Sequence, residues 1–115
     1  MKVAVVGSRS FRNEFVMAEN LDKIHQIKPI TLIISGGAVG ADTYAAEWAK
    51  YRNIPTLIFK PDWKKYGKRA GFIRNTDIVT NADTVVAFWD GESRGTKNSM
   101  DKAKQLNKPL LVVRF

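Results

Sequence analysis

Five short apolar runs, separated by segments of helical periodicity, most constrain the fold of this 115-residue chain. The runs predict strands at Lys2 to Val6, Thr31 to Ile34, Thr56 to Phe59, Thr84 to Phe88 and Leu110 to Val113. Apolar residues three and four apart predict helices around Met17 to Ile24, Ala41 to Ala49, Ala70 to Val79 and Met100 to Leu106. Strands that are apolar throughout are typical of a parallel sheet covered on both faces. The pattern predicts an α/β fold, a single Rossmann-like three-layer domain over residues 1–115 with a five-stranded parallel sheet and helices on both faces.

The rare residue types limit the chemistry of the chain. It has no cysteine and one histidine, His25, which excludes disulfides, thiolate metal sites and multi-histidine metal sites. His25 lies on the first predicted helix, and we expect it on the surface or half-buried, without a chemical role. We expect neither a metal nor a cofactor. No apolar run approaches the roughly 18 residues of a membrane span, which favours a cytoplasmic protein without a membrane partner.

The charge of the chain favours an anionic partner. Lys and Arg number 19 against 11 Asp and Glu, a formal net charge of +8. One segment, in which Asp62 is the only acid, holds Lys60, Lys64, Lys65, Lys68, Arg69 and Arg74. Such a balance is typical of proteins that bind a nucleotide or a nucleic acid, although a basic surface also serves solubility. Because parallel-sheet proteins of this size commonly dimerise through their helices, we also expect a homo-oligomer, a dimer or larger.

The unusual residues fall directly after the predicted strands. They form the segments Gly7-Ser8-Arg9-Ser10, Ser35 to Asp42, Lys60 to Gly67 with Asp62 and Trp63, and Trp89 to Thr96. The loops at the other end of the strands carry only ordinary turn residues. Ligands of parallel sheets bind outside the carboxyl ends of the strands. The distribution therefore predicts a ligand site at that edge.

The segment Ser35 to Asp42 has the composition of a phosphate-binding turn. It lies between a strand and a helix, and Gly36, Gly37 and Gly40 let the backbone approach a ligand closely. Its spacing fits neither of the two best-known glycine-rich nucleotide motifs. We expect Asp42 to cap the helix, and the helix N-terminus to offer N–H groups to a phosphate. A tight turn without a ligand is the alternative.

A second loop repeats this arrangement before the last helix. It contains Gly91, Gly95 and Thr96, and the Thr96 hydroxyl is either the N-cap of the helix or a donor to a phosphate. If the first and fourth strands are neighbours, this loop faces Ser8 and Arg9 across the sheet edge. Arg9 then becomes a candidate phosphate clamp.

Arg74, beside Asn75, is expected near the N-terminus of its helix, where the helix dipole disfavours a cation. A phosphate partner is the functional interpretation, and a carboxylate such as Asp42 or Asp90 is the structural one. Aromatic side chains fall near the same edge, where either base stacking or packing would use them: Trp63, Tyr66, Phe72 and Trp89.

Several motifs together carry a resemblance to a known family. They are Gly7-Ser8-Arg9, Ser35 to Asp42, Asp62-Trp63, Tyr66-Gly67-Lys68, Ala70-Gly71, Arg74-Asn75, Ala82-Asp83 and Phe88 to Thr96. With them the chain resembles the small YspA-like, cpYpsA-related members of the SLOG superfamily. The resemblance implies a Rossmann-like fold and a nucleotide-derived or nucleic-acid ligand.

Two better-understood branches of the superfamily frame the implied function. The Lonely Guy phosphoribohydrolases cleave nucleoside monophosphates, and their catalytic arginine is similar in context to Arg74. In their motif a glutamate follows a threonine by three residues. The threonine corresponds to Thr96, and Ser99 stands here in place of the glutamate. The carboxylates that would have to replace it are Asp90, Glu92, Asp42 and Glu47. The DNA-processing A proteins bind single-stranded DNA with a core similar in Ser35 to Asp42 and in Arg74-Asn75.

We therefore expect a protein that binds a nucleotide or a phosphoribosyl or ADP-ribose-like ligand, as a sensor, a scavenger or a processing protein. One alternative is hydrolysis of the N-glycosidic bond of a nucleoside monophosphate, with Arg74 and Asp90 as catalytic candidates. Another is binding of single-stranded nucleic acid. The candidate ligand-binding residues are Gly7, Ser8, Arg9, Ser35, Gly36, Gly37, Gly40, Asp42, Asp62, Trp63, Asn75, Asp90, Gly91, Gly95 and Thr96.

Overall fold

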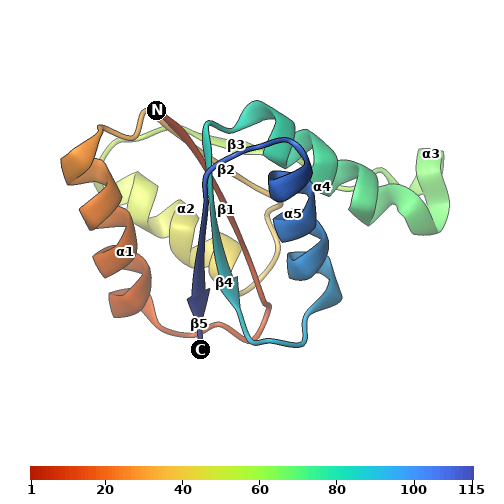
Figure 1. Ribbon diagram of the computed structural model, residues 1–115, viewed down its shortest axis with the longest axis horizontal. Coiled ribbons are helices and arrows are strands. Elements are labelled where there is room, and N and C mark those ends of the chain that lie inside the picture. Colours follow the sequence, from red (N-terminus) through yellow and green to blue (C-terminus); the bar gives the residue numbers. More distant parts are fainter.

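The computed structural model describes all 115 residues as a parallel five-stranded sheet with the strand order β3-β2-β1-β4-β5 (Figure 1). The strands are β1 (Lys2–Gly7), β2 (Leu32–Ser35), β3 (Thr56–Ile58), β4 (Thr84–Trp89) and β5 (Leu110–Arg114). Each neighbouring pair is parallel. The predicted α/β fold with a parallel sheet is therefore confirmed, and each predicted strand is present.

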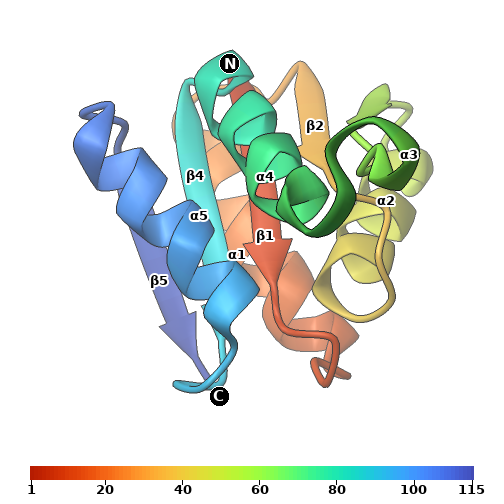
Figure 2. The ribbon, with the colours of Figure 1, turned by 90° about the vertical axis from the view of Figure 1, so that its right-hand side faces the viewer.

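Two helices cover each face of the sheet (Figure 2). One face packs against α1 (Glu14–Ile27) and α2 (Ala41–Tyr51), and the other against α4 (Ala70–Asn81) and α5 (Arg94–Gln105). Alternate residues of β1 divide between the two cores, with Val3 and Val5 on the α1–α2 side and Ala4 and Val6 on the α4–α5 side. This explains why the central strands are apolar at every position.

The edge strands are less covered than the sequence pattern predicts. All of β3 is exposed, and Leu111 and Val112 of β5 keep 41% and 36% of their surface accessible. The three central strands are the most buried, because each has a neighbouring strand on both sides and helices over both faces. No helix is long and apolar enough to cross a membrane.

The edge of the sheet where the sequence predicts a ligand site is shaped by the pairing of β1 with β4. These strands are direct neighbours, with Gly7 opposite Phe88. The chain leaves β1 towards β2 and leaves β4 towards β5, so the two connections diverge from the centre of the sheet. Such a divergence opens a crevice at the carboxyl ends of the strands, which lie at the lower edge in Figure 1.

The caps of two helices differ from the sequence predictions. Gly40, at φ +85°, precedes α2 without a side-chain cap, so the prediction that Asp42 caps this helix is wrong. Ser93 caps α5 by accepting the N–H of Thr96, which is therefore not the N-cap. The third predicted helix begins at Ala70 as expected, and Arg74 lies one turn inside it.

The segment expected to be a loop before α4 contains two short helices. Asp62 caps α3 (Trp63–Tyr66) by accepting the N–H of Lys65, and Gly67, at φ +58°, ends it. A 3-10 turn, η1 (Gly67–Arg69), then leads into α4. Together α3 and η1 form an arm that projects beyond the sheet (Figure 1).

Candidate functional site

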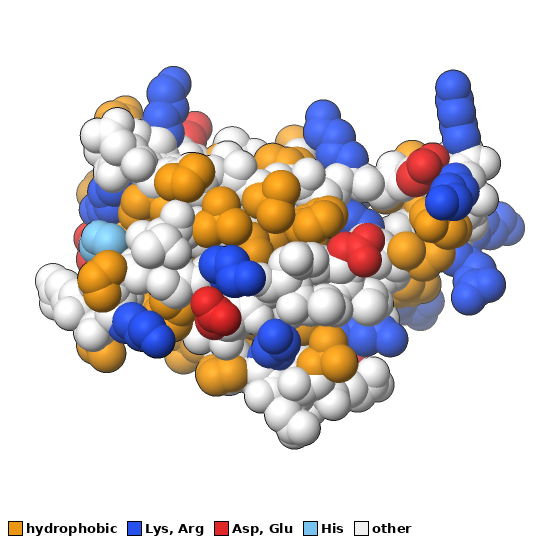
Figure 3. Space-filling view, turned by 90° about the horizontal axis from the view of Figure 1, so that it is seen from above, with side chains coloured by type: hydrophobic (Ala, Val, Ile, Leu, Met, Phe, Trp, Pro, Cys, Tyr) orange, Lys and Arg blue, Asp and Glu red, His pale blue; other side chains and the backbone are white.

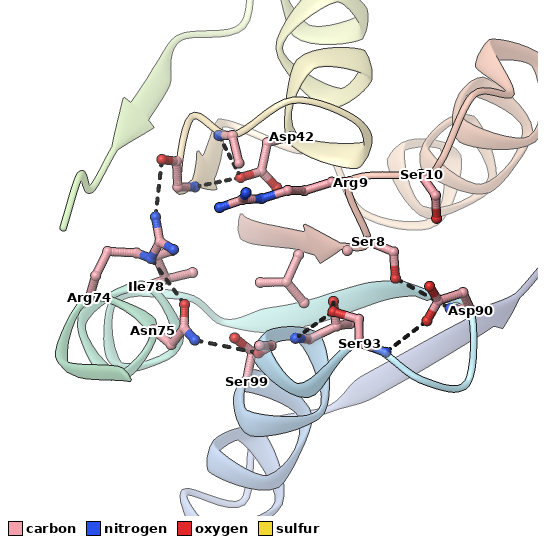
Figure 4. A pocket seen from close by; sticks show the side chains of 16 residues that line it. Ser8, Arg9, Ser10, Asp42, Arg74, Asn75, Ile78, Asp90, Ser93 and Ser99 are labelled. Atoms are coloured by element: carbon pink, nitrogen blue, oxygen red, sulfur yellow. Dashed lines mark hydrogen bonds between the residues drawn. The ribbon is translucent and has the colours of Figure 1, made fainter. Parts of the chain in front are cut away.

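A cavity of about 520 Å³ opens at the carboxyl ends of β1 and β4 (Figure 4). Its walls come from the loops after β1, β2 and β4 and from α4 and α5. The predicted residues that line it are Gly7, Ser8, Arg9, Gly36, Asp42, Arg74, Asn75, Asp90, Gly95 and Thr96. The structure thus brings together residues from four separate parts of the sequence at the predicted edge of the sheet.

Arg74 enters the cavity from α4 and is held by neutral acceptors. Its Nε donates to the Asn75 Oδ1 at 3.0 Å, and its Nη1 donates to the carbonyls of Gly36 at 3.2 Å and Phe59 at 3.5 Å. Nη2 has no hydrogen-bond partner. Partial burial lowers the pKa of Arg74, while the nearby charge of Asp42 acts to raise it. The guanidinium is therefore fixed in orientation but not neutralised.

Arg9 approaches from the loop after β1 and forms no ion pair. In Figure 4 it reaches across the cavity beside Asp42. The three ion pairs of the chain, Lys23–Glu19, Arg52–Asp22 and Lys97–Asp101, lie elsewhere. Both cavity arginines lack a carboxylate within 4.0 Å, so the predicted structural alternative of a carboxylate partner for Arg74 does not hold.

Asp42 lies in the first turn of α2 with 8% of its surface exposed. Its Oδ2 accepts the N–H groups of Gly36 at 3.2 Å and Ala38 at 3.1 Å, and thereby closes the glycine-rich loop. Burial raises the pKa of Asp42 to about 6, against the opposing effects of the Ala38 N–H and the charge of Arg74. A carboxyl that titrates near neutrality inside a cavity is a recognised mark of functional sites.

The loop after β4 is organised by Asp90. Its Oδ1 accepts the N–H groups of Glu92 at 2.9 Å and Ser93 at 2.8 Å, and these bonds lower the pKa of Asp90. The Asp90 N–H donates to the Ser8 Oγ at 3.3 Å, which joins this loop to the one after β1. Asp90 is thus an ionised loop-closing carboxylate.

The N-terminus of α5 faces the cavity at Gly95 and Thr96. The Thr96 hydroxyl is 3.0 Å from the Ser93 Oγ, and the Thr96 N–H donates to the same oxygen. The earlier N–H groups of this first turn have no partner within the helix. They carry the positive end of the helix dipole, which favours an anion at this wall of the cavity.

The N-terminus of α2 is used differently, because the chain itself covers it. A Cβ on Gly40 would lie 2.6 Å from the carbonyl oxygens of both Ser8 and Arg9, so this glycine permits close packing of two loops. The Ala41 N–H donates to the Ser8 carbonyl at 3.4 Å. The start of α5 is therefore the helix N-terminus left open towards the cavity, and Gly40 is required by the close packing of two loops.

Four predicted ligand-binding residues line neither the cavity nor the hollow beside it. Ser35 is buried, and its hydroxyl has no hydrogen-bond partner. Gly40 separates two loops, and Asp62 caps α3. Gly91, at φ +88°, lies against the guanidinium of Arg114. Turn geometry, close packing or capping explains Gly40, Asp62 and Gly91, but no contact explains the unpaired hydroxyl of Ser35.

A second hollow of about 660 Å³ continues the cavity towards the arm formed by α3 and η1. It contains the remaining predicted residues, Gly37 and Trp63, together with Lys60, Lys68 and Phe72. Trp63 and Phe72 keep 59% and 51% of their surface exposed. The arm itself, at the right-hand end of Figure 3, also carries hydrophobic side chains among Lys and Arg side chains. We call this hollow the basic-aromatic groove.

Other singled-out side chains have structural partners. The Trp89 Nε1 donates to the Ser93 carbonyl at 3.1 Å, and Arg114 lies over its ring. His25 is half-buried, and its Nδ1 accepts the N–H of Ile30 at 2.9 Å. No three His, Cys, Asp or Glu side chains gather as metal ligands do.

Sequence reasoning assigned no capping or lining role to two serines of the cavity. Ser93 caps α5. The sequence signal for this cap is a serine shortly before the last predicted helix, since serine is preferred at the N-cap. Ser99 is 1% exposed and lines the cavity one turn after Thr96. The Lonely Guy resemblance marks this position only by the absence of a glutamate.

Comparison with known proteins places the chain in a family. Residues 1–66 match the family described as YspA, cpYpsA-related SLOG. Over 117 residues, the chain is 32% identical to the Gene 61 protein of Mycobacterium phage D29, covering 96% of this chain and 94% of that protein. The chain belongs to the YspA, cpYpsA-related SLOG family.

Two solved structures share the fold of this SLOG chain. DNA processing protein A from Helicobacter pylori, described with a single-stranded DNA binding mode, aligns with a TM-score of 0.75 at 22% identity. The alignment covers 97% of this chain and 64% of that chain. The protein of the same name from Streptococcus pneumoniae aligns with a TM-score of 0.72 at 22% identity, over 96% of this chain and 49% of the other.

Proposed function

We propose that the cavity binds the phosphate group of a nucleotide or nucleotide-derived ligand. The observation that carries this proposal is the pair of cations, Arg9 and Arg74, that face one cavity without a carboxylate partner. Holding a guanidinium in a partly buried position without an opposite charge is unfavourable, and a bound anion removes that cost. The planar guanidinium matches the oxygens of a phosphate.

Three further features support a phosphorylated small molecule. The start of α5 adds unpaired N–H groups and a positive dipole end opposite the arginines. The cavity volume of about 520 Å³ lies in the range of small-molecule sites. The site occupies the crevice between β1 and β4, where open α/β sheets bind nucleotides.

In this proposal the cavity binds the nucleotide without hydrolysing it. The carboxylates that line the cavity are Asp42 and Asp90, and each has an oxygen engaged by two backbone N–H groups. Ser99 supplies no acid where the Lonely Guy resemblance implies a glutamate. Chromatography of AMP incubated with the protein tests this point, and release of free adenine would contradict it.

Titration calorimetry with AMP tests the binding. We expect the wild-type protein to bind AMP, and Arg74→Ala to weaken binding by about ten- to one-hundredfold, the typical effect of losing a charged hydrogen-bond partner. Arg69→Ala is the matched control, because Arg69 is exposed, lies just before α4 in η1 and lines neither cavity nor groove. Equal affinities of the two variants, or no binding by folded wild type, would refute the proposal.

The basic-aromatic groove favours a second candidate function, the binding of single-stranded nucleic acid. Exposed aromatic rings beside lysines suit bases and backbone phosphates respectively. The Helicobacter pylori protein of similar fold is described with such binding. Fluorescence anisotropy with an oligothymidine strand tests it. We expect affinity to fall steeply with salt and Trp63→Ala to weaken it by roughly tenfold. Tyr51→Ala, which alters an exposed aromatic outside the groove, is the control. An affinity for the strand that changes neither with salt concentration nor in Trp63→Ala would exclude this candidate function.

A further inference from the structure

Asp42 presents one unused carboxylate oxygen to the cavity. Both hydrogen bonds that close the glycine-rich loop, from the N–H groups of Gly36 and Ala38, end on Oδ2. Oδ1 has no hydrogen bond, although the residue is more than nine-tenths buried and lines the cavity. Closing the loop therefore accounts for one oxygen of this carboxylate and leaves the other without a partner (Figure 4).

A carboxylate is not needed to close the loop. An asparagine at the same position would offer a neutral Oδ1 to the same two N–H groups. The neutral group would also avoid the desolvation that acts on the buried Asp42 carboxylate. The other charged side chains around the cavity are Arg9, Arg74 and Asp90, and none of them forms an ion pair with Asp42. The Asp42 carboxylate thus lies near the charges of Arg74 and Arg9 but pairs directly with neither, within a site otherwise suited to an anion.

The two arginines and the free Asp42 oxygen together restrict which ligand can bind. A phosphate beside Arg9 and Arg74 places negative charge near Asp42, so the group that meets Oδ1 has to be a hydrogen-bond donor. The sugar hydroxyls of a nucleotide are donors attached close to its phosphate. Inorganic phosphate has no such second group.

We propose that Asp42 Oδ1 accepts a hydrogen bond from a ribose hydroxyl of the ligand, and that the site therefore selects phosphoribosyl compounds over free phosphate and over sugars without these hydroxyls. This inference rests on the proposed phosphate site. It makes Asp42 the residue that determines specificity, while the arginines supply the charge that attracts the phosphate. Ser99 and Thr96 complete the polar wall of the same cavity.

Calorimetry at pH 8 with AMP, 2′,3′-dideoxyadenosine monophosphate and inorganic phosphate tests the inference. We expect wild type to bind AMP about ten- to one-hundredfold more tightly than the dideoxy compound, the usual range for a hydrogen bond to a charged group. The Asp42→Asn variant keeps the loop-closing acceptor and turns an NH₂ donor into the cavity. We expect this variant to bind AMP and the dideoxy compound with nearly equal affinity, and to bind inorganic phosphate more tightly than wild type does.

The outcomes separate the inference from the function on which it rests. Equal binding of both nucleotides by wild type would overturn the hydroxyl contact while leaving the phosphate site intact. An undiminished preference in Asp42→Asn would overturn the role of Asp42. Failure of wild type to bind either nucleotide or phosphate would refute the proposed function itself. Asp77→Asn, which removes an exposed carboxylate of α4 outside the cavity, is the control and should retain the wild-type preference.

Discussion

The Asp42→Asn variant also tests the electrostatics of the cavity through the stability of the fold. Burial raises the pKa of Asp42 from the ordinary value of 3.8 to about 6. Between these values the folded protein holds a proton that the unfolded chain has released. The free energy of unfolding contributed by this group therefore falls as the pH rises through that window. Above it, the folded state carries an ionised carboxylate that water would solvate better.

The difference between the two pKa values gives the size of the effect. At about 1.4 kcal/mol for each pH unit, ionised Asp42 destabilises the fold by about 3 kcal/mol at pH 8. Asparagine has nearly the same shape and retains an acceptor for the N–H groups of Gly36 and Ala38. We expect Asp42→Asn to be more stable than wild type by up to about 3 kcal/mol at pH 8, with the gain vanishing below about pH 4.

Urea denaturation at a series of pH values measures this difference. Subtracting wild type from the variant cancels the other carboxyls, including Asp83 and Asp90, whose pKa values are lowered by backbone N–H bonds. Asp77→Asn controls for the loss of one negative charge and should show no comparable gain at pH 8. A gain that does not change with pH, or a variant less stable than wild type at pH 8, would refute the reasoning.

Two further predictions concern the loops and the ligand. Gly40→Ala should lower the free energy of unfolding, measured with urea, by more than about 2 kcal/mol, because φ is +85° and a Cβ would meet the carbonyls of Ser8 and Arg9. Gly95→Ala, where a Cβ meets nothing within 4 Å, should instead stabilise α5 by about 0.5–1 kcal/mol. Equal effects of the two changes would contradict this account. AMP at about one hundred times its dissociation constant should raise the free energy of unfolding by about 2.7 kcal/mol, and Arg9→Ala should lose most of this gain at the same concentration; an unchanged gain would show that the ligand binds elsewhere.

The sequence predicted the sheet because its signal is local. Each strand is a short apolar run, and the helices between them keep their apolar residues on one face. The capping of α2 was harder to predict, since a plausible N-cap aspartate stands two residues after Gly40. Only the packing of Gly40 against Ser8 and Arg9 shows that the helix begins earlier and that Asp42 turns back to the loop.

The composition of the site was predicted more accurately than the roles within it. The rule that ligands bind at carboxyl ends of strands located Arg9, Asp42 and Arg74 near one another. It did not distinguish the covered N-terminus of α2 from the open one of α5. That difference depends on the Ala41 N–H reaching the Ser8 carbonyl, a contact between residues distant in sequence.

The most direct test of the central claim is the amide spectrum of nitrogen-15-labelled protein during titration with AMP. The account predicts that the largest chemical-shift changes occur at Gly36, Gly95 and Thr96, together with the side-chain Nε of Arg74. Largest changes along the outer faces of α1 and α2, or no changes in the folded protein at saturating AMP, would contradict a phosphate site between β1 and β4.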